Sequence, residues 1–159
     1  LLTLCCQFSL KLLVELSCKS EYAILALLEL ATHYQKREPL QIRQIAAQQN
    51  IPDRYLEQLL ATLRRGGLVK SQRGSKGGYF LTREPWKISL FDIFVCVEGL
   101  DKLQNCEDDS KSKTSDSAVV EDIWEEARQA ANLVLQKYTL LDLCEKRDSK
   151  KQLDIMYYI

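Results

Sequence analysis

The sequence predicts a mainly α-helical fold with one small β-hairpin, and three observations lead to this prediction. Between residues 20 and 65, apolar side chains recur at spacings of three and four, the period of an amphipathic helix. Residues 68–82 form two short β-prone segments on either side of a glycine-rich stretch, the pattern of a hairpin. Residues 118–138 repeat the helical spacing without a break.

Length and composition limit the class of protein. The chain has 159 residues, of which 46% are hydrophobic and 28% charged, so wholesale disorder is excluded. We expect one ordinary domain, or one small domain with an appended arm. No uncharged apolar stretch has the 18 or more residues that a membrane-spanning helix needs. Residues 1–13 are apolar but lack a basic start, so we interpret them as an N-terminal extension and expect a cytoplasmic protein by default.

The first 65 residues predict three helices. The first begins near Ser20, interpreted as its N-cap, with Glu21 in the first turn, where the helix dipole favours a carboxylate. A short helix over residues 41–49 and a stronger one over residues 53–65 follow, joined by a tight turn. Two short helices joined in this way form a helix-turn-helix.

The helix over residues 53–65 has two distinct faces. Four leucines form its buried face, and Gly66-Gly67 ends it. Polar side chains on the outer face have the right chemistry to reach base edges and phosphates in a major groove, although any solvated helix is polar on one side. The outward residues we single out are Arg54, Tyr55, Glu57, Gln58 and Arg65.

A basic hairpin follows directly. Residues 68–73 and 79–82 are the expected strands, and the glycine-rich tip between them carries Lys76. Arg73 and Lys76 supply positive charge, while Gly77 and Gly78 would let the backbone approach a phosphate or enter a narrow groove. A helix-turn-helix followed by such a hairpin is a winged helix, and the alternative is a plain surface hairpin.

The formal net charge of zero conceals two oppositely charged segments. Residues 36–87 carry a net charge of +7, and residues 98–128 carry −6. The positive segment coincides with the helix-turn-helix and wing, as expected for a surface that binds DNA.

The remainder of the chain predicts an arm. Ser89 opens a short helix with a capping box, which ends the winged-helix domain over residues 14–99. Residues 100–117 are polar and acidic, and we interpret them as a mobile effector loop. Residues 118–143 predict a dimerisation helix and the start of a short terminal helix. This terminal helix is expected to span Leu140–Lys146, with Thr139 as its cap. Residues 144–159 are left as a C-terminal tail.

Two stretches carry a family resemblance. The chain resembles the Rrf-type winged-helix transcription regulators, the family of IscR, NsrR and CymR, from Val14 to Leu143. The two most specific stretches of this match are YLEQLLATLRRGGLV and RGSKGGY. The resemblance implies a homodimer on near-palindromic promoter DNA, for which we expect a repressor. It also implies that the helix over residues 53–65 reads the DNA, that the wing residues named above enter the minor groove, and that the long helix pairs with a partner subunit.

The sensing site departs from the family pattern. Cluster-binding members carry three cysteines before the long helix, whereas here only Cys106 matches, and Glu21 matches an acidic ligand of some relatives. Because iron–sulfur clusters strongly prefer thiolates, a cluster on Cys106 and Glu21 is disfavoured. A thiol switch at Cys106, a small-molecule effector and no effector remain as alternatives, and Glu21 is more simply a helix N-terminal charge.

Other functions are weaker alternatives. The scattered cysteines predict reduced thiols, with Cys18 and Cys96 packed as small hydrophobes, and the single histidine, His33, argues against zinc. An enzyme with a Cys–His nucleophile lacks any sign of an oxyanion site. A winged-helix adaptor that binds protein but not DNA is the main competing hypothesis.

Overall fold

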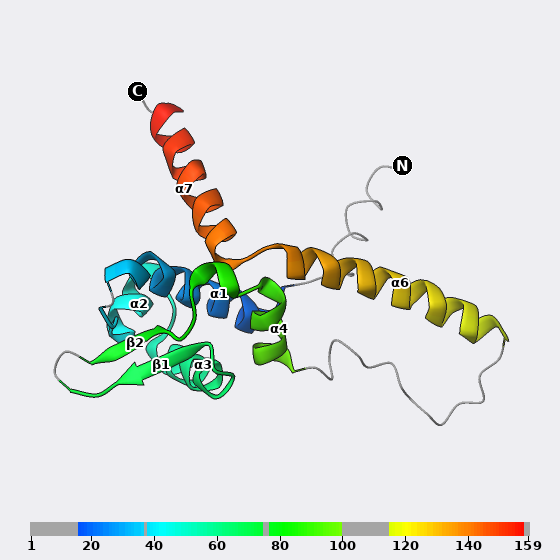
Figure 1. Ribbon diagram of the computed structural model, residues 1–159, viewed down its shortest axis with the longest axis horizontal. Coiled ribbons are helices and arrows are strands. Elements are labelled where there is room, and N and C mark those ends of the chain that lie inside the picture. The colour runs from blue at the N-terminus through cyan, green and yellow to red at the C-terminus, as the bar shows by residue number, and fades with distance from the viewer. Residues whose placement is uncertain (1–15, 37, 75–76, 100–114, 158–159) are drawn as a thin grey trace, which may run out of the picture.

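The structure is a computed structural model that describes residues 16–36, 38–74, 77–99 and 115–157, with side chains placed for 116–153 of the last range. Figure 1 shows a body of helices with a two-stranded hairpin along one side, and two long helices that leave this body in different directions. Within the described residues, no helix is long and apolar enough to cross a membrane.

The helical part of the body is close to the prediction. Helix α1 spans Cys18–Thr32 and is followed by a 3-10 turn, η1, Tyr34–Lys36. Helices α2, Ile42–Gln49, and α3, Asp53–Arg65, form the helix-turn-helix. The bounds of α3 agree with the prediction to the residue because its start follows Pro52 and its end meets Gly66-Gly67.

The hairpin and the fourth helix complete the body. Strands β1, Val69–Gln72, and β2, Gly78–Leu81, pair antiparallel with Val69 opposite Leu81. A second 3-10 turn, η2, Pro85–Lys87, precedes α4, Leu90–Glu98. The predicted capping box at Ser89 is confirmed, because its side chain accepts from the Asp92 amide and the Asp92 carboxylate accepts from the Ser89 amide.

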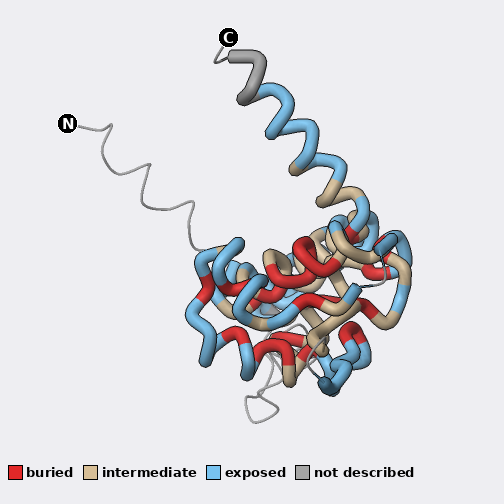
Figure 2. Tube along the Cα trace, turned by 90° about the vertical axis from the view of Figure 1, so that its left-hand side faces the viewer, coloured by how far each residue is buried: buried red, intermediate tan, exposed pale blue. Residues whose placement is uncertain are grey.

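A single apolar core holds the body together. Figure 2 shows buried stretches facing the interior of the body and exposed residues along the outer part of the last helix. The largest fully buried side chains come from α1, α2, α3 and α4, from the residues just before β1 and just after η2, and from the start of α7: Leu27, Ile45, Leu56, Leu60, Leu63, Leu68, Ile88, Ile93 and Leu140.

Two predictions at the start of α1 are wrong. The N-cap is Ser17, whose hydroxyl accepts from the Ser20 amide at 3.1 Å. Ser20 itself is buried and donates to the Glu98 carboxylate at 2.7 Å, so it faces α4 and cannot cap. Because the helix starts at Cys18, that cysteine lies at its exposed end rather than in an apolar face.

The two arm helices are longer than predicted. Helix α6 spans Ser115–Lys137, so residues 115–117, expected in the loop, form its first turn, where Asp116 suits the helix dipole. Helix α7 spans Leu140–Tyr157, well beyond the short helix predicted to end at Lys146. No glycine or proline follows Lys146, and the lysines and glutamine beyond it are good helix formers. Residues 100–114 of the expected loop, like residues 1–13, lie outside the described residues.

Candidate nucleic-acid interface

The turn between α2 and α3 sets the orientation of α3. Asn50 adopts a left-handed conformation with φ of 52°, which asparagine tolerates better than most residues, and it ends α2. Ile51 is buried, and its amide donates to the Ala46 carbonyl at 3.0 Å. The turn is therefore anchored in the core, and α3 leaves it at a fixed angle.

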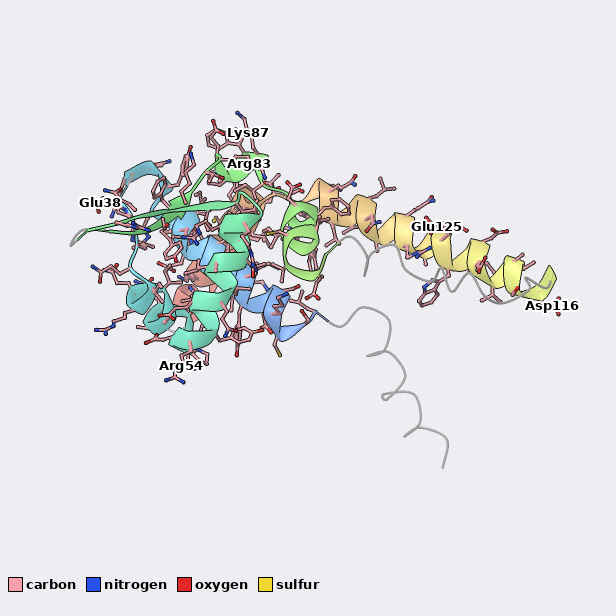
Figure 3. All side chains as sticks on the ribbon, turned by 90° about the horizontal axis from the view of Figure 1, so that it is seen from below. Glu38, Arg54, Arg83, Lys87, Asp116 and Glu125 are labelled. Carbon is pink, nitrogen blue, oxygen red and sulfur yellow. The ribbon has the colours of Figure 1, made fainter. Side chains whose placement is uncertain are left out.

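Helix α3 separates its apolar and polar residues completely. Leu56, Leu59, Leu60 and Leu63 are buried against the core. Figure 3 shows Arg54 pointing away from the body. The residues predicted from the sequence are brought together on the exposed face of this one helix: Arg54, Tyr55, Glu57, Gln58 and Arg65.

Tyr55 is held in place by a second ring. Its ring packs edge-on against Tyr22 of α1, with 5.6 Å between the ring centroids. Such edge-to-face pairs stabilise by about 0.5–1.5 kcal/mol beyond their buried area. Tyr55 is still 36% exposed. The contact with Tyr22 therefore fixes the position of the Tyr55 ring and leaves part of it accessible on the outer face of α3.

The wing glycines have a structural role that the sequence prediction did not include. A Cβ at Gly78 would collide with the Leu40 carbonyl and lie 3.1 Å from the Gln41 amide. This crowding arises because β2 runs close to residue 40, where the Tyr79 amide donates to the Leu40 carbonyl at 2.8 Å. Gly77 likewise donates to the Gly74 carbonyl at 2.9 Å. Arg73 is exposed directly after β1, and Lys76 lies outside the described residues.

Three open cavities surround α3, and each is lined by cations that we did not single out. The first, about 490 Å³, lies between α2, the start of α3 and the wing and includes Arg43. The second, about 480 Å³, lies beside β1 and includes Arg64 and Lys70. The third, about 420 Å³, lies towards α1 and includes Lys19 next to Arg65, which was already named on α3. Lys19 is 34 residues before α3 in the chain, and nothing in the sequence indicates that it comes near.

The cavity beside α2 also contains two carboxylates. Asp53 and Glu57 line it together with Arg43 and Gln41. Carboxylates repel phosphates but accept hydrogen bonds from the amino group of cytosine, whereas arginine pairs with guanine. The side chains of this cavity therefore suit base edges, whereas the cations of the other two cavities suit phosphates.

The proposed sensor residues are only partly described. Glu21 is exposed in the first turn of α1, consistent with a helix N-terminal charge. The start of α1 is tied to the end of α4 by Ser17 and Ser20, which both donate to Glu98, and by Lys19, which donates to the Val97 carbonyl. Cys106 lies outside the described residues, so its role stays a prediction.

The side chains that could bind a metal do not form a metal centre within the described residues. Across the part of the chain that the structure describes, no group of three or more His, Cys, Asp and Glu side chains could hold a metal ion. Burial raises the pKa of the Cys96 and Cys144 thiols, which disfavours the thiolate that binds metal or reacts. The segment of residues 100–114 offers one thiol, Cys106, where clusters require several.

The fold and this surface define the class of protein. A helix-turn-helix whose second helix exposes a polar face, followed by a basic hairpin, is a winged-helix DNA-binding protein. The family model of Rrf2, described as an iron-dependent transcriptional regulator, matches residues 16–146. The chain belongs to this family, as the resemblance implied, and is a DNA-binding transcription regulator.

Individual relatives agree with this assignment. The transcriptional regulator CymR of Bacillus subtilis is 35% identical over 92% of this chain and all of its own length. IscR of Serratia proteamaculans is 30% identical over 85% of this chain and 82% of its own. These relatives are named as regulators, not as enzymes.

Solved structures are similar over the same region. The structure of B. subtilis CymR, titled as its global cysteine regulator, gives a TM-score of 0.71 at 34% identity and covers 84% of this chain and 98% of its own. The structure of T. potens IscR gives a TM-score of 0.69 at 35% identity and covers 84% of this chain and 88% of its own.

Proposed function

We propose that this regulator binds near-palindromic promoter DNA as a homodimer and represses transcription. Helix α3 enters the major groove with Arg54, Tyr55, Glu57 and Gln58 towards the bases. The wing, with Arg73 and Lys76, contacts the adjacent minor groove. The observation that carries this proposal is the complete separation of α3 into four buried leucines and a polar outer face.

The exposed apolar side chains of α6 support the homodimer. Helix α6 projects from the body in Figure 1 and touches mainly α4. Large exposed apolar patches mark interaction surfaces. Six apolar side chains of this helix are between 46% and 66% exposed: Val119, Val120, Ile123, Trp124, Leu133 and Val134.

A second copy of the chain is the occupant we propose for this surface. Its 23 residues make α6 about 35 Å long, close to the spacing of two half-sites one helical turn apart. Two such helices packed side by side would bury both apolar stripes and hold two copies of α3 on successive major grooves. Ile123→Glu is expected to convert the dimer to a monomer, measured by light scattering, and to lower DNA affinity by at least tenfold.

The DNA interface is tested with a matched pair of variants. Arg73→Ala removes one cation from the wing, whereas Lys87→Ala removes one from η2, which Figure 3 shows on the opposite side of the body from Arg54. Binding to a duplex from the chain's own promoter is measured by fluorescence anisotropy over a range of salt concentrations.

The salt dependence separates the two variants. Each lost phosphate contact reduces the slope of log K against log salt by about one. Because the homodimer loses one contact from each subunit, we expect the slope to fall by about two for Arg73→Ala and not to change for Lys87→Ala. Equal slopes for both variants, or equal affinity for promoter and random duplexes, would contradict the proposed interface.

A further inference from the structure

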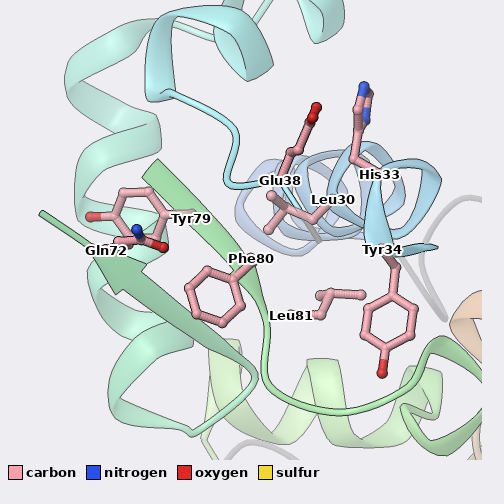
Figure 4. A pocket seen from close by; sticks show the side chains of 8 residues that line it. All are labelled: Leu30, His33, Tyr34, Glu38, Gln72, Tyr79, Phe80 and Leu81. Carbon is pink, nitrogen blue, oxygen red and sulfur yellow. The ribbon is translucent and has the colours of Figure 1, made fainter. Parts of the chain in front are cut away.

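A pocket lies on the body between the last turn of α1 and strand β2, and we call it the wing pocket. Its volume is about 260 Å³, slightly below the range of about 300–1,000 Å³ typical of small-molecule sites. It therefore suits a small ligand, such as one aromatic ring with a short polar group. Figure 4 shows the residues that line it, among them Leu30, Tyr34, Glu38, Tyr79, Phe80 and Leu81.

The apolar lining of the wing pocket consists of core residues at its base and aromatic residues at the surface. Leu30 and Leu81 are 3% and 4% exposed and belong to the main core. Tyr34, Tyr79 and Phe80 are half-buried and add three rings at the surface. Aromatic rings carry partial negative charge on their faces and attract both other rings and cations.

The charge of the wing pocket differs from that of its surroundings. Each of the three cavities beside α3 contains at least one arginine. The described lining of the wing pocket contains the Glu38 carboxylate and neither lysine nor arginine. This lack of cations is notable because five of the eight lining residues belong to the segment of net charge +7. The wing pocket therefore favours a positively charged ligand.

A hydrogen-bond acceptor lies at the same end of the pocket as the carboxylate. Figure 4 shows His33 beside Glu38, with Phe80, Leu81 and Tyr34 towards the other end. The His33 Nδ1 lies 3.2 Å from the Glu29 carbonyl and 3.7 Å from the Glu29 carboxylate. The tautomer that carries its proton on Nδ1 donates to the Glu29 carbonyl and presents Nε2 as an acceptor.

We propose that the wing pocket binds a small aromatic cation, with its ring at the apolar end and its charged group at Glu38. The pocket shares no residue with α3, and the proposal goes beyond the proposed DNA binding. Because Tyr79 and Phe80 belong to the wing, the ligand would touch both the wing and the end of α1.

Three probes of nearly equal size and different charge test the proposal. Benzamidine is a cation, benzamide is neutral and benzoate is an anion at neutral pH. Their binding to the full chain is measured by isothermal titration calorimetry without DNA, so the result does not depend on whether the DNA proposal holds. We expect benzamidine to bind at least tenfold more tightly than benzamide, and benzoate to bind least.

Substitutions assign the binding to this pocket. Glu38→Gln should bring benzamidine to within about threefold of benzamide. The control Glu84→Gln changes a half-buried carboxylate that lies outside the pocket and pairs with Lys87, and it should leave the tenfold preference unchanged. Glu38 is exposed, so its variant is not expected to disturb folding, which the melting temperature checks. Equal binding of all three probes, no binding at millimolar concentration, or a preference that survives Glu38→Gln would overturn the proposal.

Discussion

Replacing Gly66 by alanine tests how tightly α3 is packed against α4. Gly66 ends α3 with φ of −75° and ψ of 0°, a conformation that alanine adopts without strain. On backbone grounds alone, the substitution should stabilise by about 0.4–1 kcal/mol. The new methyl group, however, would lie far inside van der Waals contact with the Cys96 Sγ and 3.2 Å from the Cys96 Cβ.

The packing is expected to outweigh the backbone gain. Inserting a methyl group into a filled space costs about 1–3 kcal/mol, so the net destabilisation should be about 1–2 kcal/mol, with the backbone gain subtracted. Rotation of the Cys96 thiol would relieve part of the clash but would break its hydrogen bond to the Thr62 carbonyl, at 3.7 Å.

A double-mutant cycle with Cys96→Ala isolates this contact. Urea unfolding, followed by circular dichroism, gives the free energy of unfolding for the four proteins. Without the Sγ, Gly66→Ala should be nearly neutral, so the two substitutions should couple by about 1–2 kcal/mol. If Gly66→Ala destabilises equally with and without the thiol, the packing explanation is wrong.

Two further predictions concern helix caps on either side of the arm. Ser89→Ala should lower the free energy of unfolding by about 1 kcal/mol, because it leaves the Asp92 amide without its cap; a change within the error of urea unfolding would contradict this. Hydrogen bonds from the Thr139 hydroxyl and amide, both 2.7 Å, lower the pKa of Asp142. The stability it contributes is present above the ordinary carboxyl pKa and is lost as the pH falls through the lowered value. Asp142→Asn should therefore have a lower melting temperature than the wild type at pH 7, and this difference in melting temperature should disappear below about pH 4. A difference that persists at pH 2 would show that the charge of Asp142 is not its cause.

The body of the fold could be predicted because its signals are local. Helix α3 has four leucines at helical spacing and a double-glycine stop, and its bounds and buried face agree with the prediction. The hairpin strands agree to within one residue at each end. In both cases the residues that define the element lie within a few positions of each other.

The errors at the start of α1 and in the surroundings of α3 arise where distant parts of the chain meet. Ser17 and Ser20 are both capable N-caps, and only the position of Glu98 decides that Ser20 turns inwards. Lys19 joins the surface beside α3 through tertiary packing alone. The reason for Gly78 also depends on Leu40, which lies 38 residues earlier.

The path of the chain around α4 has a consequence for how such a protein can change. The chain leaves the body after Glu98, at one end of α4, and returns at the other end, where the Leu90 amide donates to the Tyr138 carbonyl at 2.9 Å. The two ends of this helix are about 14 Å apart, a gap that a linker of about five extended residues spans. Residues 99–138 are thus an insertion between neighbouring points of one domain. An insertion of this kind can be lengthened, shortened or replaced without changing the order in which the chain passes through the core, so this segment can diverge while the winged-helix body stays the same.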